Sequence, residues 1–116
     1  MEDKVLVIGL DGATPEIIEP LVDKNYLPNL GMMMEKGVYG NLTSTIPNVS
    51  QVAWTSFLTG KKPGKHGVTG QIMLREGYEF SGACPRDIRG NTLWDILSEE
   101  GKKIGILRCP MTWPPW

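Results

Sequence analysis

The sequence predicts an α/β fold built around a mostly parallel sheet, and three observations support this prediction. Two short aliphatic runs, Lys4–Leu10 and Lys103–Cys109, have the continuous hydrophobicity of strands buried on both faces. Segments whose apolar residues recur at helical spacing alternate with the predicted strands, which is typical of a largely parallel sheet. The chain has 116 residues, 41% of them apolar and 22% charged, as expected for one small globular domain.

The first predicted strand leads into a helix that starts near Thr14. Threonine is a favourable helix N-cap, and Pro15 occupies the first helical position, where proline is well tolerated. Apolar residues at helical spacing extend this helix to about Asp23. Pro20 lies inside the pattern, so the helix is expected to be short or kinked.

A second helix and a second strand follow. The helix is predicted over Leu30–Lys36, with Asn29 as its candidate cap and Gly37 at the usual stop position. Apolar and polar residues then alternate over Val38–Ile46, which predicts a strand that ends at Pro47.

The next predicted helix covers Gln51–Thr59 and ends at Gly60. The glycine-rich stretch Lys61–Gly70 is predicted to be a loop. A short hairpin is expected over Ile72–Phe80, with its turn at Glu76 and Gly77.

The last predicted helix runs to Glu100, and either Asn91 or Thr92 is its expected cap. Gly101 ends it, and the second aliphatic strand follows directly.

The charge and composition of the chain limit the kinds of molecule that it is expected to bind. The net charge is −1, so the chain lacks the basic surface that nucleic acid binding requires. The apolar runs are too short to span a membrane, and no basic amphipathic segment suggests binding to a membrane surface. The acidic N-terminus does not resemble a signal peptide, so a cytoplasmic location is expected. A small molecule is therefore the expected partner, and the two cysteines are expected to be reduced.

Asp11 is the first candidate site residue, because it stands at the carboxyl end of the first predicted strand. Open α/β sheets bind ligands at that edge. A carboxylate there, followed by Gly12, suits a hard or borderline metal ion. Equally, Asp11 by its position alone is consistent with a simple turn or cap residue.

Ser50 is the second candidate, because it lies at the start of the third predicted helix. The N-terminal end of a helix offers unpaired N–H groups and a positive dipole end, which together attract anions. A serine hydroxyl activated by a metal can attack phosphorus there. The alternative interpretation is that Ser50 is an ordinary N-cap. His66, the only histidine, is expected to be a hydrogen-bonded turn residue. Lys61, Lys62 and Lys65, in the loop after the third predicted helix, are expected to be solvated.

Several motifs in order resemble the alkaline phosphatase superfamily, and in particular the prokaryotic form of its type I phosphodiesterase/nucleotide pyrophosphatase family. The resemblance covers about Lys4–Pro115. The motifs are Gly-Leu-Asp11-Gly12, Leu27-Pro28-Asn29-Leu30, the Ser50 segment with Trp54-Thr55-Ser56-Phe57-Leu58-Thr59-Gly60, Pro63-Gly64-Lys65-His66-Gly67, Arg89-Gly90-Asn91-Thr92-Leu93-Trp94-Asp95 and Pro110-Met111-Thr112.

The resemblance implies a metal-dependent phosphodiesterase or phosphatase with a partial three-layer sandwich. It identifies Asp11 as a metal ligand and Ser50 as both the nucleophile and a metal ligand. Family members use two divalent metal ions, commonly Zn²⁺, and form a covalent phospho-enzyme. The resemblance also implies that residues 1–116 are the N-terminal part of one alkaline phosphatase-like catalytic domain whose remainder is absent. Because each zinc site needs about three protein ligands or more, these residues alone are expected to be inactive.

Two departures bear on the substrate. Many members of this branch have threonine at the position of Ser50, but serine supports the same chemistry. Nucleotide-cleaving members have an asparagine at the position of Ala53, so nucleotide pyrophosphatase activity is in doubt. Two alternatives stay open: a phosphomutase-like isomerase of the same superfamily, and a non-catalytic α/β domain that binds a nucleotide or a partner.

Overall fold

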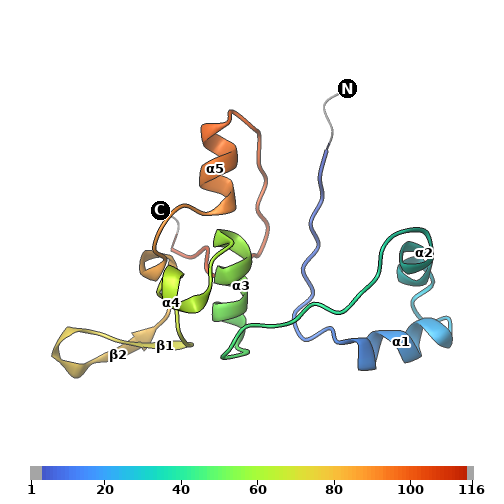
Figure 1. Cartoon of the computed structure of the whole chain (residues 1–116), viewed down its shortest axis with the longest axis horizontal. Coiled ribbons are helices and arrows are strands. Elements are labelled where there is room, and N and C mark those ends of the chain that lie inside the picture. The colour runs from blue at the N-terminus through green and yellow to red at the C-terminus, as the bar shows by residue number, and fades with distance from the viewer. Residues whose placement is uncertain (1–3, 115–116) are drawn as a thin grey trace. The chain divides into compact units, whose positions relative to one another are not determined.

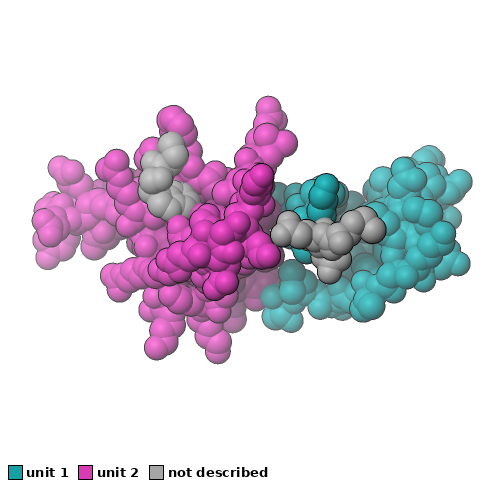
Figure 2. Space-filling view, turned by 90° about the horizontal axis from the view of Figure 1, so that it is seen from above, with its two compact units in different colours: residues 1–43 teal, residues 44–116 magenta. Residues whose placement is uncertain are grey.

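The computed structural model describes residues 4–114 and divides into two compact units (Figures 1 and 2). Unit 1 comprises residues 1–43 and contains helices α1 (Pro15–Asp23) and α2 (Pro28–Lys36). Unit 2 comprises residues 44–116 and contains all of the other helices and both strands found in the described residues.

The two helices of unit 1 form much as the sequence predicts. Helix α1 has Thr14 at its N-cap and Pro15 at its first position, and it continues through Pro20 to Asp23. Helix α2 begins earlier than expected, at Pro28, because proline is favourable at the first helical position.

Glycine lets the two helices of unit 1 approach each other. A Cβ atom placed on Gly31 would lie 2.9 Å from Cγ1 of Val22, so the helices are in close contact at this point. None of the described residues of unit 1 is buried, however, and the apolar side chains of this unit stay in contact with solvent.

Unit 2 begins with α3 (Ser50–Thr59), which ends at Gly60 in the left-handed conformation, with φ of 63°. A short helix follows inside the predicted loop. The elements after α3 are α4 (Pro63–His66), β1 (Ile72–Leu74), the 3-10 turn Glu76–Tyr78, β2 (Phe80–Gly82), the 3-10 turn Pro85–Asp87 and α5 (Leu93–Glu99).

The core of unit 2 is small and formed by side chains from α3 and from the loops. Val52 and Leu58 of α3 pack with Val68 and Met111, and all four are buried. Partly buried side chains surround them: Val49, Ala83, Ile88, Trp94 and Cys109. Helix α3 is therefore the central element of this unit.

The predicted hairpin is confirmed (Figure 1). Strands β1 and β2 pair antiparallel, with Met73 opposite Ser81, and Gly77 takes up the turn with φ of 75°. The side chain of Arg75 ties the hairpin to the following turn, because its guanidinium group pairs with both carboxylate oxygens of Asp87.

Helix α5 begins at a capping box. The hydroxyl group of Thr92 accepts a hydrogen bond from the backbone N–H of Asp95, and the Asp95 carboxylate accepts one from the backbone N–H of Thr92 at 2.7 Å. Of the two caps that the sequence allowed, Thr92 is the one used.

The parallel sheet and the three-layer sandwich are not confirmed. The described residues form one sheet of two antiparallel strands, which is compatible with an α/β fragment. The runs Lys4–Leu10, Val38–Ile46 and Lys103–Cys109 contain no strand. Their side chains are strongly exposed, for example Val5 at 88% and Leu107 at 89%. The physical reason is that a strand exists only through hydrogen bonds to a neighbouring strand, and these runs have none in residues 4–114.

Among the described residues, no helix is long and apolar enough to cross a membrane.

Candidate active site

Asp11 lies at the end of the exposed apolar run of unit 1, in a turn that it forms with Gly12. Gly12 has φ of 68°, a conformation that other residues adopt at a cost. No atom lies within 4 Å of the position that a Cβ atom of Gly12 would occupy. The glycine is therefore required by the backbone turn, and the Asp11 side chain is exposed beside it.

Ser50 is the first residue of α3, in unit 2, and its side chain is half-buried. The N-cap is Val49, whose carbonyl oxygen accepts hydrogen bonds from the backbone N–H groups of Val52 and Ala53 at 3.1 and 3.0 Å. The interpretation of Ser50 as the N-cap is therefore wrong by one position. Its hydroxyl group instead lies in the first turn, at the positive end of the helix dipole.

Helix α3 holds Ser50 on a well-packed support. One face of the helix is buried through Val52, Thr55 and Leu58. The hydroxyl group of Thr55 is satisfied inside the helix, since it donates to the carbonyl oxygen of Gln51 at 2.6 Å. A helix buried along one face over most of its length presents its first turn in one orientation.

Gln51 follows Ser50 in the chain, and it is a buried polar residue that sequence reasoning did not single out. Its side-chain Oε1 is buried and has no hydrogen-bond partner in the described part of the chain. A buried acceptor without a partner is uncommon in folded proteins, and it favours a donor or a cation beside it. The sequence signal was the amide side chain that directly follows Ser50.

The lysines that follow α3 lie at the far end of this helix from Ser50. A helix of ten residues is about 15 Å long, so the loop after Gly60 is distant from the first turn. Lys61 donates through Nζ to the carbonyl oxygen of Arg89 at 3.4 Å, while Lys62 and Lys65 are exposed. The predicted solvated face is confirmed for Lys62 and Lys65, whereas Lys61 is half-buried.

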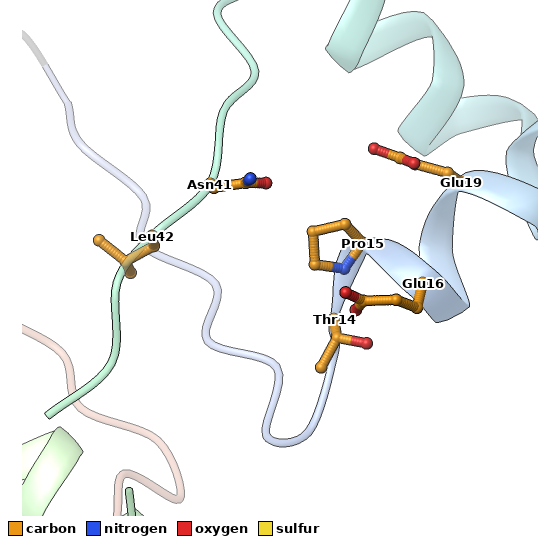
Figure 3. A pocket seen from close by; sticks show the side chains of 6 residues that line it. All are labelled: Thr14, Pro15, Glu16, Glu19, Asn41 and Leu42. Carbon is orange, nitrogen blue, oxygen red and sulfur yellow. The ribbon is translucent and has the colours of Figure 1, made fainter. Parts of the chain in front are cut away.

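A pocket of about 450 Å³ in unit 1 is not built for a phosphate (Figure 3). It is open, and Glu16 and Glu19 carry negative charge to its edge. The pKa of Glu16 is lowered by a hydrogen bond from its own backbone N–H and by the Thr14 side chain. The Glu19 carboxylate accepts a hydrogen bond from Tyr39 at 3.0 Å. Carboxylates therefore already occupy the start of α1, and Asp11 does not line this pocket.

The chemistry available from the two candidate residues is that of oxygen donors. A carboxylate from Asp11 and a hydroxyl group from Ser50 suit a hard or borderline divalent cation. The described residues contain no group of three or more histidine, cysteine, aspartate or glutamate side chains that could hold a metal ion. Since Asp11 and Ser50 belong to different units, their proximity stays a prediction.

Comparison with known proteins yields one family. A family model described as type I phosphodiesterase / nucleotide pyrophosphatase matches residues 5–116, which is nearly the whole chain. Comparisons with curated proteins and with solved structures give no match.

Proposed function

The chain belongs to the type I phosphodiesterase / nucleotide pyrophosphatase family, and we propose that Ser50 is the nucleophile of a metal-dependent phosphate-ester hydrolase. The family is a group of hydrolases that act on phosphate esters, so the coarse activity follows from membership. The observation that carries the finer proposal is the position of Ser50 in the first turn of α3, where the helix dipole favours a negatively charged group.

The proposed reaction has two steps. In the first, the Ser50 hydroxyl loses its proton, its Oγ forms a bond to phosphorus, and the bond from phosphorus to the ester oxygen breaks, so that an alcohol leaves. In the second, a water oxygen bonds to phosphorus, the bond from phosphorus to Oγ breaks, a proton of the water passes to Oγ, and the phosphate leaves. The positive dipole end at the start of α3 stabilises the negative charge that develops on the phosphoryl oxygens in both steps.

Divalent metal ions, with Zn²⁺ the family's common choice, are proposed as cofactors. The donors that this chain offers are the Asp11 carboxylate and the Ser50 hydroxyl group, and the buried acceptor of Gln51 lies directly beside the latter along the chain. When bound, such ions polarise the phosphate and lower the pKa of the attacking hydroxyl group. The family's use of two ions requires further ligands beyond those found in residues 4–114.

The exposed apolar runs support the proposal that residues 1–116 are part of one larger catalytic domain. Five apolar side chains of the run Val5–Leu10 are exposed. Such a run is expected to be stable only when other parts of the protein cover it. We propose that these runs pair as the parallel strands of the complete domain, which brings the end of the first strand to the start of α3. A small phosphate ester is the proposed substrate, and a cytoplasmic location stays a prediction.

The test measures the release of alcohol and phosphate from a generic phosphodiester and a monoester by the full-length protein, with and without a chelator. We expect Ser50→Ala to lower kcat by more than about 10³-fold, because it removes the attacking atom. The matched control is Ser98→Ala, an exposed serine of α5, which should leave kcat unchanged.

Asp11→Ala is expected to lower activity in a way that added metal partly restores, since it removes one ligand rather than the nucleophile. Full activity of Ser50→Ala would show that the nucleophile is another residue. Formation of a phosphate isomer instead of free phosphate or alcohol would favour the mutase alternative.

A further inference from the structure

His66 is fully buried in α4, although it takes no part in the proposed chemistry. Its Nε2 lies 2.9 Å from the Oγ of Ser56 on α3, and its Nδ1 accepts a hydrogen bond from the backbone N–H of Val68 at 3.2 Å. Both ring nitrogens are therefore used, and they join α3 to the loop that follows α4.

The hydrogen bond at Nδ1 fixes the state of the ring. Because the Val68 N–H is a donor, Nδ1 must carry a lone pair, so the proton of the neutral ring is on Nε2 and is donated to Ser56. If Nδ1 also carried a proton, two donors would face each other, and the hydrogen bond from the Val68 N–H would be lost. The pKa of His66 is lowered by burial and by the positive charge of Lys61, which is consistent with a neutral ring at physiological pH.

The backbone around His66 is held as closely as its ring. The carbonyl oxygen of His66 accepts a hydrogen bond from the N–H of Arg89 at 2.9 Å. A Cβ atom on Gly67 would lie 3.1 Å from Nε of Arg89 and 3.2 Å from the carbonyl oxygen of Asp87, so the chain segments touch there. His66 thus connects three segments: α3, the loop after α4, and the loop before α5.

The charged groups near the ring are mostly positive. Lys61 and Lys62 directly precede α4, Lys65 belongs to it, and the Arg89 side chain packs against Gly67. Asp87 faces Gly67 through its backbone carbonyl, and its carboxylate is paired with Arg75. Helix α3 contributes no charged side chain. No free carboxylate in these elements offsets a proton on the ring.

We propose that His66 is a positioning residue for Ser50: its neutral ring anchors α3 through Ser56, and so fixes the helix whose first turn carries the nucleophile. This inference rests on the proposed function of Ser50. Helix α3 is one rigid element with a buried face, so a shift at Ser56 moves its first turn as well. Misplacement of a nucleophile by about 1 Å can lower a rate by about 100-fold.

The first test needs no catalysis. His66 is the only histidine of the 116 residues, so the nitrogen resonances of its ring are assigned without ambiguity in this chain. We expect the Nε2-protonated neutral form at pH 7, and a titration midpoint below the ordinary value of about 6.5. The amide signals of Val68 and of Ser50 are expected to shift with that same midpoint, and Ser56→Ala should abolish the response at Ser50 only.

The second test uses kinetics of the full-length protein. Ser56→Ala is expected to lower kcat by about 10- to 100-fold with KM changed less than about twofold, because positioning rather than binding is lost. His66→Asn retains an acceptor for the Val68 N–H but does not reach Ser56, so it should lower kcat as much as Ser56→Ala. Since both changes break the same hydrogen bond between His66 and Ser56, the double variant should have a kcat no lower than that of either single variant. Ser98→Ala is the control.

The outcomes separate this inference from the function on which it rests. A wild-type protein that hydrolyses phosphate esters, and whose kcat is unaltered by Ser56→Ala, overturns the positioning role alone. A ring that is protonated on Nδ1, or α3 amide signals that ignore its titration, also overturns it. A wild-type protein without hydrolase activity, but with amide signals of α3 that follow the ring, overturns the proposed function and leaves the link between His66 and α3 in place.

Discussion

Units 1 and 2 both contain α-helices, but these helices differ in whether they bury side chains. In unit 2, α3 buries Val52 and Leu58 completely, and buried polar residues such as Thr55 and His66 are hydrogen-bonded. In unit 1, α1 and α2 touch at Gly31, yet none of the described residues is buried.

The difference shows that a hydrophobic pattern and a hydrophobic core are separate properties. Both units contain apolar residues at regular spacing, and in both the helix ends follow local rules. Burial needs a second surface, which α3 finds in α4, α5 and their loops. The stability of residues 1–116 is therefore expected to reside mainly in unit 2, and the predictions below test this contrast.

The largest expected effect is that of a core truncation. Leu58 is 1% exposed, and Leu58→Ala should lower the free energy of unfolding by about 2–5 kcal/mol, because it leaves a cavity in a packed core. Leu42, in unit 1, is 95% exposed, and Leu42→Ala should change the free energy of unfolding by less than about 0.5 kcal/mol. Urea unfolding followed by far-UV circular dichroism measures both, since each unit contains α-helices. Equal losses for the two variants would contradict the contrast between the units.

Two glycines give a smaller and more local contrast. Gly67 has φ of 86°, and backbone and side-chain atoms lie close to the position of its missing Cβ atom, so Gly67→Ala should destabilise unit 2 by about 1–2 kcal/mol. In Gly31→Ala the new methyl group meets only the Val22 side chain.

For Gly31→Ala, a gain of about 1 kcal/mol in helix propensity opposes that contact, so the net change is expected to stay within about 0.5 kcal/mol. Thermal unfolding followed by circular dichroism compares the two glycine variants. A large loss for Gly31→Ala would mean that α1 and α2 are packed as firmly as α3 is.

The smallest expected effect depends on pH. Hydrogen bonding to Arg75 is the main cause that lowers the pKa of Asp87. Because its pKa is lower in the folded state than the unfolded value of about 3.9, the stabilisation is complete above that pH and is lost as the pH falls through the folded pKa. Asp87→Asn should therefore reduce stability at neutral pH, and the difference from the wild type should vanish in strong acid.

The control for the ion pair comes from unit 1. Glu19 accepts a hydrogen bond from Tyr39 on an exposed surface, so Glu19→Gln should leave the unfolding midpoint unchanged across the same pH range. Urea midpoints at several pH values measure both variants. A pH-independent loss for Asp87→Asn would show that the carboxylate acts through packing and not through its charge.

Local signals were sufficient for the ends of several helices and for the hairpin, but not for α4, which forms inside a predicted loop. Pro15 is favourable at the first position of α1, Thr92 and Asp95 cap the first turn of α5, and Gly60 takes the left-handed conformation at the end of α3. The sequence therefore predicts where α1 and α5 begin and where α3 ends. Ser50 lies at the start of α3 as expected, but it is the first helical residue and not the N-cap.

Only the tertiary structure decided what depends on distant partners. The buried ring of His66 is bonded to Ser56 of another helix, and Gly67 is required by contacts with Asp87 and Arg89, which are some twenty residues further along the chain. The predicted strands of the parallel sheet are not formed within residues 4–114, because pairing is a property of two segments, whereas an aliphatic run is a property of one. The proposed approach of Asp11 to Ser50 rests on the same proposed pairing, so the sequence names both residues but cannot by itself bring them together.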